Sequence, residues 1–280
     1  MCVRVGTLSH THTHAHTCNK CLQFILLSSC RHPFLYLFCI ALAATEVELN
    51  QENRTYVVHV QLRPEDMYAL QAQTNVATTL QNSYLAVAAR TINDTAGNRV
   101  NPILPSRPLL PSSFIGDLVP PRLVRFSVLS GADGHNDYAE LHIQFTEVVN
   151  TSTIDFSRIT LQSAAANATY SHTLTGGQLL TNLTHIVKLA LTQNDISSII
   201  SLAAIGQPGS IGQGLLQSPD QTFLSLDQGA LTDMSQYPSV RVPVDEARPV
   251  ATYEVDYLPP ALQAFFFNAS SSMIALFFSE

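Results

Sequence analysis

The chain has 280 residues and no tryptophan, and its five cysteines all precede residue 40. From Glu46 onward no disulfide can form within the chain, which excludes an immunoglobulin-type disulfide core there. The same part has a single lysine, Lys188, and 11 basic residues against 21 acidic ones. Nucleic-acid binding needs a basic surface, so this charge balance argues against a nucleic-acid partner. Charged residues are only 12% of the chain, about half the usual share, and Ser, Thr, Asn and Gln are abundant, which suits a β-rich extracellular protein.

The first 45 residues read as a targeting segment. The apolar run Phe34–Leu42 has the length of a signal-peptide core and is too short to span a bilayer. Small residues follow it, and the A-x-A pattern predicts cleavage after Ala43 or Ala44. The alternative is an N-terminal membrane anchor over residues 22–44, which Arg31 and Pro33 interrupt.

Alternating His and Thr residues precede that segment, at 10–17, next to Cys18 and Cys21. Imidazole and thiolate are zinc ligands, but a low-complexity tract has no scaffold to fix their geometry, so we expect no metal site there. A CA dinucleotide repeat encodes the same alternation, so residues 1–45 also read as a spurious start of a gene model.

The rest of the chain repeats itself. Residues 56–66 align with 185–195, residues 83–98 with 222–237, residues 120–126 with 259–265, and residues 141–147 with 274–280. The blocks recur in the same order and at a nearly constant offset, which is the signature of a tandem repeat. The predicted organisation is a leader (1–45), the C-terminal half of one repeat (46–103), a linker (104–116), a complete repeat (117–244), a second linker (245–255) and the first strands of a further repeat (256–280), with the chain truncated in mid-repeat at both ends.

Within the complete repeat, period-two alternation predicts short strands, among them 122–129, 141–145, 185–191 and 240–244. Thr192 is a helix N-cap candidate, and the apolar spacing after it predicts one short helix. Short strands separated by turns over about 125 residues favour a two-sheet antiparallel β-sandwich.

The repeated pattern resembles the bacterial-type Ig-like repeats of large adhesin-like surface proteins. The pattern runs from Pro-Pro-x-Leu-x-x-Phe through a strand ending in Phe-Thr-Glu to a turn written Asp-x-Ala-Gly-Asn. The positions that carry it are Pro120, Pro121, Leu123, Phe126, Phe145, Glu147, Val149, Asn150, Ile159, Leu161, Gln162 and Asp233, with Asp94–Asn98 in the preceding copy. The resemblance implies tandem Ig-like sandwiches that serve as spacers, adhesive modules or enzyme appendages.

Two turns invite a calcium interpretation. Asp94 and Asn98, and Asp233 in the next copy, could supply oxygen ligands near a domain junction. The competing interpretation, which we favour, is a turn in which Asp accepts backbone hydrogen bonds and Gly takes a positive φ. The second copy has Gln236-Tyr237 where the first has Gly-Asn, so a shared role of this turn is not expected. Residues 133–144 resemble a calcium loop but lack its final Glu, and read as a hairpin tip.

The sequence predicts N-glycosylation and contains none of the catalytic motifs that we searched for. Six Asn-x-Ser/Thr acceptors are present, more than composition predicts, and with a signal peptide they predict glycosylation. They are Asn53, Asn93, Asn150, Asn167, Asn182 and Asn268. Glu147 recurs as Glu280, which suggests a structural acid. No motif of a hydrolase, zinc protease or phosphate-binding loop occurs, and no cofactor is predicted.

We therefore expect a non-catalytic extracellular or cell-surface protein. Its partners would be neighbouring repeats and an extracellular protein or glycan, with membrane contact only through the alternative anchor. Two other hypotheses remain open, namely an accessory segment of a large secreted enzyme and the ectodomain of a membrane receptor.

Overall fold

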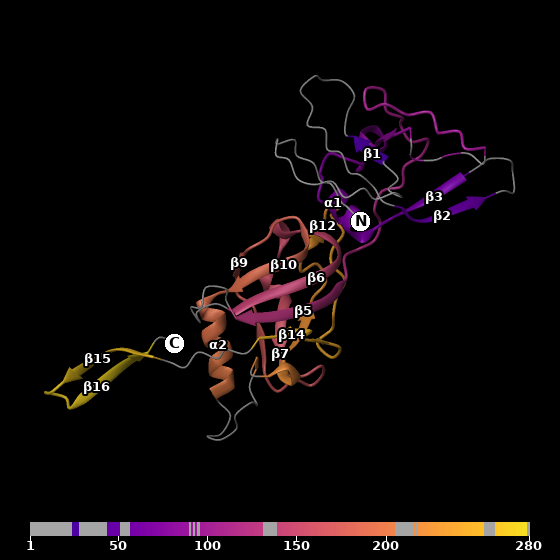
Figure 1. Cartoon of the computed structure of the whole chain (residues 1–280). Helices are drawn as coiled ribbons and strands as arrows, with labels where there is room; N and C mark the ends of the chain where they lie inside the picture. The colour runs from indigo at the N-terminus through magenta and orange to yellow at the C-terminus, as the bar shows by residue number, and fades with distance from the viewer. Residues whose placement is uncertain are drawn as a thin grey trace. The chain divides into compact units, whose positions relative to one another are not determined.

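A computed structural model describes residues 24–27, 44–50, 57–89, 91, 93, 96–130, 139–204, 215–216, 218–254 and 261–278 (Figure 1). This part of the chain is mainly β-structure and forms two units, Met1–Leu118 and Val119–Glu280. The predicted signal-peptide core and Ala43 lie outside the described residues, as does Asn53, and Ala44 is the first residue of a strand. Neither helix of the described part is long and apolar enough to cross a bilayer.

The first unit contains two pairs of antiparallel strands. Strand β1 (Phe24–Leu27) pairs with β4 (Tyr84–Val87), and β2 (Ala44–Asn50) pairs with β3 (Val57–Leu62). Helix α1 (Pro64–Gln71) follows β3 and begins with proline, whose fixed φ suits the first helical position. A short 3-10 helix, η1 (Leu80–Asn82), precedes β4.

The second unit is built on two open sheets. The larger has the order β14-β5-β6-β10-β9, with β12 added on β6. The smaller has the order β13-β11-β7-β8. All pairs are antiparallel except β14 with β5, which are parallel. The strands are β5 (Leu123–Ser130), β6 (Ala139–Asn150), β7 (Ile159–Gln162), β8 (Ser171–Thr173), β9 (Gly177–Leu179), β10 (Thr184–Leu191), β11 (Phe223–Leu226), β12 (Thr232–Asp233), β13 (Arg248–Pro249) and β14 (Thr252–Tyr253).

One hydrophobic core lies in this unit and takes side chains from both sheets. Leu141, Ile143 and Phe145 alternate along β6 and are each 1% exposed, as the period-two pattern predicts. Leu161 and Leu224, from the smaller sheet, are 0% exposed and belong to the same cluster. Each such side chain contributes roughly 1.5–3 kcal/mol of burial free energy, so the core rests on packing without a disulfide.

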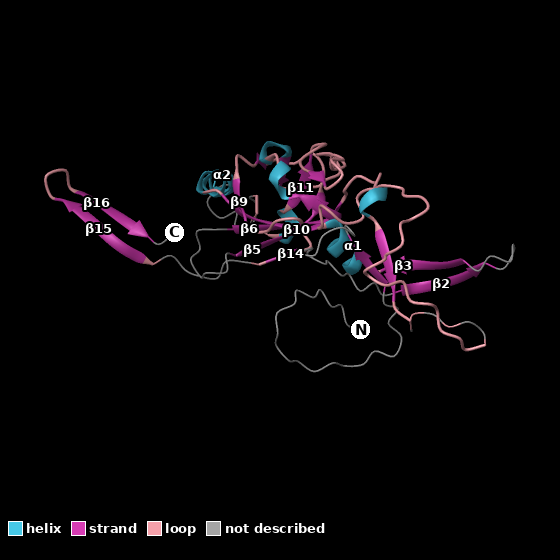
Figure 2. Cartoon of the chain, turned by 90° about the horizontal axis from the view of Figure 1, so that it is seen from above, coloured by secondary structure: helices cyan, strands magenta, loops and turns pink. Residues whose placement is uncertain are grey.

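Helix α2 (Gln193–Ala204) follows β10 as the sequence predicts. Thr192 caps it, because the Asp195 N–H donates to Thr192 Oγ1 at 3.1 Å. On its apolar face Ile199 is buried and Ile196 packs against the core. Figure 2 shows α2 and the strands of this unit from above.

The predicted strand over 240–244 and the predicted linker over 245–255 differ from what the structure places there. Val242 makes only an isolated bridge with Leu226. The chain then continues into β13 and β14, which pair with β11 and β5. Proline at 243 and at 249 removes backbone donors, so this edge pairs in short pieces instead of one continuous strand.

The two units contain the same pairings at aligned positions. In the first unit Leu85 pairs with Leu109 and Val87 with Ile103. In the second, Leu224 pairs with Arg248 and Leu226 with Val242. The bridge from Asn93 to Arg99 likewise corresponds to that from Thr232 to Pro238. The 3-10 helix η4 (Pro219–Gln221) stands before β11 as η1 stands before β4.

A last hairpin, β15 (Leu262–Asn268) and β16 (Met273–Phe278), has the register of β5 and β6. In β5–β6 the pairs are Phe126 with Ile143 and Val128 with Leu141, and in β15–β16 they are Phe265 with Leu276 and Phe267 with Ile274. Each hairpin has a register shift at the same place, between residues 123 and 125 and between residues 262 and 264. The Asn268 side chain closes the second hairpin by accepting from the Ser270 and Ser271 N–H groups.

Candidate functional site

Asp233, a calcium candidate from the sequence, lies in a hydrogen-bonded turn. Its side chain is 2% exposed, and its Oδ1 accepts from the Tyr237 N–H at 2.7 Å. Its own N–H donates to the Tyr237 carbonyl at 3.0 Å. Asp233 therefore holds the turn that we favoured over a calcium loop.

The turns at the two aligned positions have similar backbone geometry, although Gln236-Tyr237 replaces Gly-Asn. A shared role of the two turns is still not expected, as the sequence indicates. Gly97 has φ +86°, and Gln236, which aligns with it, has φ +70°. The positive φ is therefore retained at Gln236 although the side chain there is not glycine. Asn98 is exposed and Asp94 lies outside the described residues, so no ligand set forms from these two within the described part.

Glu147 and Asp233 are the described acidic pair of the second unit that could hold a cation. Glu147, in β6, is 6% exposed, and its carboxylate lies within 4.8 Å of that of Asp233. Two carboxylates at this distance suit a hard cation such as Ca²⁺, which takes six to eight oxygen ligands. Two oxygens alone fall short of that number, so the pair is a candidate fragment of a site.

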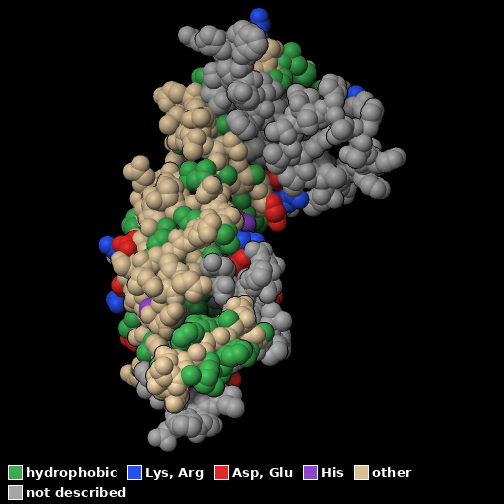
Figure 3. Space-filling model, turned by 90° about the vertical axis from the view of Figure 1, so that its left-hand side faces the viewer, with side chains coloured by type: hydrophobic (Ala, Val, Ile, Leu, Met, Phe, Trp, Pro, Cys, Tyr) green, Lys and Arg blue, Asp and Glu red, His purple; other side chains and the backbone are tan. Residues whose placement is uncertain are grey.

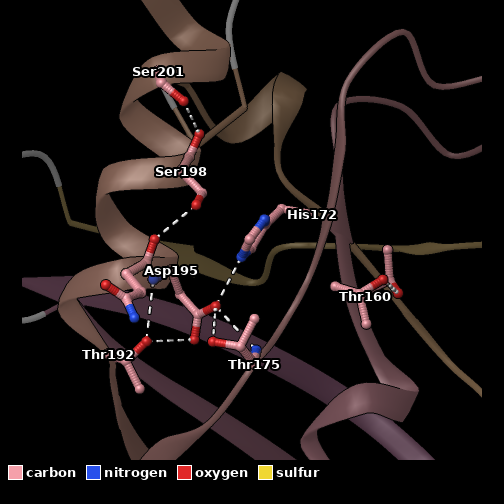
Figure 4. A network of polar contacts seen from close by, with 9 residues as sticks. Thr160, His172, Thr175, Thr192, Asp195, Ser198 and Ser201 are labelled. Atoms are coloured by element: carbon pink, nitrogen blue, oxygen red, sulfur yellow. Dashed lines mark hydrogen bonds and ion pairs between the residues drawn. The ribbon is translucent and has the colours of Figure 1, made fainter.

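A second buried acid, Asp195, is the centre of a larger polar network (Figure 4). Asp195 is 0% exposed and lies in the first turn of α2. Its Oδ1 accepts from the Thr175 N–H and the Thr175 hydroxyl, both at 2.9 Å, and lies 2.9 Å from His172 Nε2. Its Oδ2 accepts from the Thr192 hydroxyl at 2.8 Å.

The network favours the ionised form of Asp195. Burial alone would raise the pKa of this carboxyl, but the hydrogen bonds from His172, Thr192 and Thr175 outweigh burial and hold the pKa below its usual value. The carboxylate also lies at the start of α2, where the helix dipole favours negative charge. Elsewhere in the unit, burial lowers the pKa of His185.

The His172–Asp195 pair has part of the geometry of a catalytic relay, yet its surroundings indicate an anchor. In a relay the imidazole is hydrogen-bonded both to the acid and to a nucleophile. Here the neighbouring hydroxyls, those of Thr175 and Thr192, donate to the carboxylate and not to the imidazole. The network ties the start of α2 to β8 and to the segment that leads into β9.

The first unit has a buried acid at the matching place. Asp66, which aligns with Asp195, is 0% exposed and lies in the first turn of α1. Arg63, at the position that matches Thr192, donates from Nε to Asp66 Oδ2 at 3.3 Å. Both strand-to-helix junctions thus bury an aspartate that the preceding cap residue contacts.

The sequons divide by exposure. Asn93, Asn167 and Asn182 are exposed. Asn150 and Asn268 are half-buried, and their side-chain oxygens accept from backbone N–H groups of the following turns. The three exposed acceptors lie where a glycan would project into solvent.

A shallow hollow lies beside one of these acceptors. It is lined by Ser163, Ala164, Asn167, Thr169, Tyr170 and Gln221. Its lining combines one aromatic ring with amide and hydroxyl groups and includes no charged side chain. Hydrogen bonding to a neutral polar group is the chemistry that this lining offers.

Sequence reasoning missed His172 and the burial of Asp195. The Thr-x-x-Asp spacing at 192–195 predicts the capping contact, and the structure has it. The contact with His172 joins residues 23 positions apart, and no local pattern marks it. His172 and His142 are both half-buried, and their Nε2 atoms lie 2.9 Å from Asp195 Oδ1 and from Glu140 Oε2.

No protein-family model, curated protein or solved structure matches the chain.

Proposed function

We propose that the chain is a non-catalytic extracellular module, made of Ig-like β-sandwich repeats, that acts as a spacer or as an adhesive or binding segment. The observation that carries this proposal is the repeated pairing of the two units. Three pairs of the first unit recur at the aligned positions of the second, at Leu224–Arg248, Leu226–Val242 and Thr232–Pro238. Tandem repeats of one fold are typical of stalks and adhesive arrays.

Side-chain details support the same proposal. The Ser83 hydroxyl donates to the Thr79 carbonyl at 2.6 Å, and the Thr222 hydroxyl donates to the Ser218 carbonyl at 2.7 Å. The same offset that aligns Ser83 with Thr222 aligns Thr79 with Ser218. A buried aspartate at each strand-to-helix junction and the common register of the two hairpins add to this support.

The second unit has the construction that a spacer needs. Its core cluster includes 20 buried residues drawn from both sheets, among them Phe126 and Val187, each 0% exposed. Such a core resists extension until it opens cooperatively. Surface features fit the extracellular part of the proposal, because exposed sequons occur in both units, at Asn93, Asn167 and Asn182.

Pulling the chain by its ends in a single-molecule force experiment tests the spacer role. We expect one force peak for the second unit, with about 45 nm of chain released when residues 119–254 extend. A chain that extends smoothly, with no peak of this length, would contradict the proposal.

A matched pair of variants in β5 controls the assignment of that peak. Phe126→Ala removes a core side chain, should cost about 3–5 kcal/mol and should lower the peak force. Val124→Ala changes a side chain that is 50% exposed on the same strand and should leave the force unchanged.

A further inference from the structure

The loop between β7 and β8 contains a sequon that forms part of the hollow described above. Asn167 is the acceptor of this sequon and Thr169 is its hydroxyl residue, and both are exposed. Both residues also line the hollow, together with Tyr170. A sugar attached to Asn167 would therefore start at the wall of the hollow itself.

Hydrogen bonds hold this loop in place. The Ser163 N–H donates to the Tyr170 carbonyl at 2.9 Å, and the Tyr170 N–H donates to the Ser163 hydroxyl at 3.1 Å. The Ala164 carbonyl accepts from Gln162 Nε2 at 2.7 Å, and the Gln162 side chain is buried. The wall of the hollow is thus already formed, and a ligand would not bear the entropy cost of ordering it.

The side chains of the lining suit a sugar ring. Tyr170 supplies a half-buried aromatic ring, and Ser163 and Thr169 supply hydroxyl groups. Gln221, from η4, supplies an amide whose Oε1 is buried and has no hydrogen-bond partner among the described residues. Rotation about the soft χ3 torsion would turn this acceptor toward a donor in the hollow. An aromatic ring with a few polar groups around it matches the apolar face and the hydroxyl rim of a sugar.

The hollow is also neutral and small. Among the described residues no charged side chain lines it, and on the face that Figure 3 shows charged side chains are few and scattered. Its volume of about 340 Å³ lies near the lower end of the range of ligand pockets, roughly 300–1,000 Å³. A single neutral sugar residue agrees with both properties.

We propose that Asn167 carries an N-linked glycan whose first sugar, an N-acetylglucosamine, lies in the hollow against Tyr170. In the covalent step Asn167 Nδ2 forms a bond to the anomeric carbon of a lipid-diphosphate oligosaccharide and gives up one proton. The bond from that carbon to the diphosphate oxygen breaks, and the lipid diphosphate leaves. The donor belongs to the secretory pathway, so this inference rests on the extracellular part of the proposed function.

Tethering makes a shallow hollow sufficient. A sugar bonded to Asn167 stays beside Tyr170 at an effective concentration in the millimolar range. Contacts too weak to hold a free sugar can therefore hold this one, while the outer sugars of the glycan project into solvent. The bound sugar would join the loop to η4 through Gln221, and for this reason it should stabilise the second unit.

Thermal unfolding of the full chain, made with and without glycans, tests the inference. A secretory host makes the glycosylated chain with a host signal peptide before residue 1, and bacteria make the bare chain. Both are measured in reducing buffer because the chain has five cysteines. We expect the glycosylated chain to unfold about 3 °C higher, and trimming each glycan to its first sugar should preserve this gain. No glycan on Asn167, or loss of the gain on trimming, would overturn the inference.

Two exposed sequons of the second unit give a matched control. Asn167→Gln should remove most of the gain, whereas Asn182→Gln, at a sequon that does not line the hollow, should preserve it. Asn167 has φ +50°, a conformation that asparagine adopts more readily than glutamine. Each variant is therefore also measured as the bare chain, and that difference is subtracted. Equal losses of the gain for the two variants would contradict the inference.

A pair of tyrosines tests the contact with the aromatic ring. Tyr170→Leu keeps an apolar side chain for the core and removes the ring, so the gain should disappear although mass spectrometry still finds the glycan on Asn167. Tyr237→Leu changes a half-buried tyrosine that does not line the hollow, and the gain should persist. A gain that survives Tyr170→Leu would refute the contact.

Free N-acetylglucosamine separates a tethered sugar from one that comes from another molecule. At millimolar concentration it should leave the unfolding temperature of the bare chain unchanged. A rise in that temperature would show a receptor for outside glycans and would overturn the tethered assignment. Failure of the proposed function has a different sign, since the chain with only its own first 45 residues would then stay inside the cell, whereas these measurements use the host signal peptide.

Discussion

At the scale of single residues, the unit depends on buried acids that organise backbone ends. Asp195 takes four contacts from three residues, and Asp233 accepts from the N–H of Tyr237. A buried carboxylate is tolerated where its oxygens accept hydrogen bonds, and both oxygens of Asp195 meet that condition. Asp195 ties down the start of α2, and Asp233 holds the turn that follows β12.

Replacing Asp195 by Asn should destabilise the second unit by about 2 kcal/mol, since the new amide cannot accept every bond that the carboxylate accepts. Urea unfolding followed by circular dichroism measures this change. The control is Asp227→Asn, in an exposed ion pair with Arg241 at 3.6 Å, where we expect less than about 0.5 kcal/mol. Similar losses for the two variants would contradict an anchoring role for Asp195.

The lowered pKa of Asp195 also predicts how the stability difference between the unaltered chain and Asp195→Asn depends on pH. Because the folded pKa lies below the unfolded value of about 3.9, the ionised group contributes stability that is fully present above that value. The contribution is lost as the pH falls through the folded pKa. The difference in stability between the unaltered chain and Asp195→Asn should therefore be constant near neutral pH and shrink below about pH 4. A difference that grows on acidification would contradict the assignment of the network to Asp195.

At the scale of elements, local patterns predicted the strands and the helix but not the edges. Alternation along 141–145 and the Thr192 cap gave β6 and α2, because the buried face and the capping contact are both local properties. The edge over 240–255 differed, because β13 and β14 are two residues long and depend on partners far away in sequence. The His172–Asp195 contact escaped prediction for the same reason.

The turn after β12 offers a test at this scale. Gln236 has φ +70°, a conformation that costs a side-chain-bearing residue roughly 1 kcal/mol, and the matching turn of the first unit has Gly97 there. Gln236→Gly should raise the free energy of unfolding by about 0.5 kcal/mol after the entropy of glycine in the unfolded chain is counted.

The matched control for that turn is Gln228→Gly, an exposed glutamine that is not among the positive-φ residues. There the entropy cost of glycine acts alone, and stability should fall slightly. Thermal melts of the two variants give opposite shifts if the turn is strained as described. A decrease for Gln236→Gly equal to that for Gln228→Gly would count against the strain.

At the scale of the whole molecule, the sequence repeat and the pairings at aligned positions point to one plan used more than once. Internal alignment of the sequence predicts this plan, because the aligned blocks contain the core residues of the strands. The alignment could not predict that β15–β16 is exposed or that the apolar cluster around Val87 is only partly buried, because burial depends on which other strands are present.

An extracellular module with exposed sequons should emerge from a eukaryotic secretory host carrying glycans. We expect the full chain, expressed with its own first 45 residues, to appear in the medium and to lose mass on treatment with an N-glycosidase. Asn167→Gln and Asn182→Gln should each remove one glycan, because both side chains are exposed at their sequons. Asn194→Gln makes the same change at an exposed asparagine outside any sequon and should leave the mass of glycan unchanged. Retention of the full chain inside the cell without glycans would contradict the predicted signal peptide and, with it, the extracellular part of the proposal.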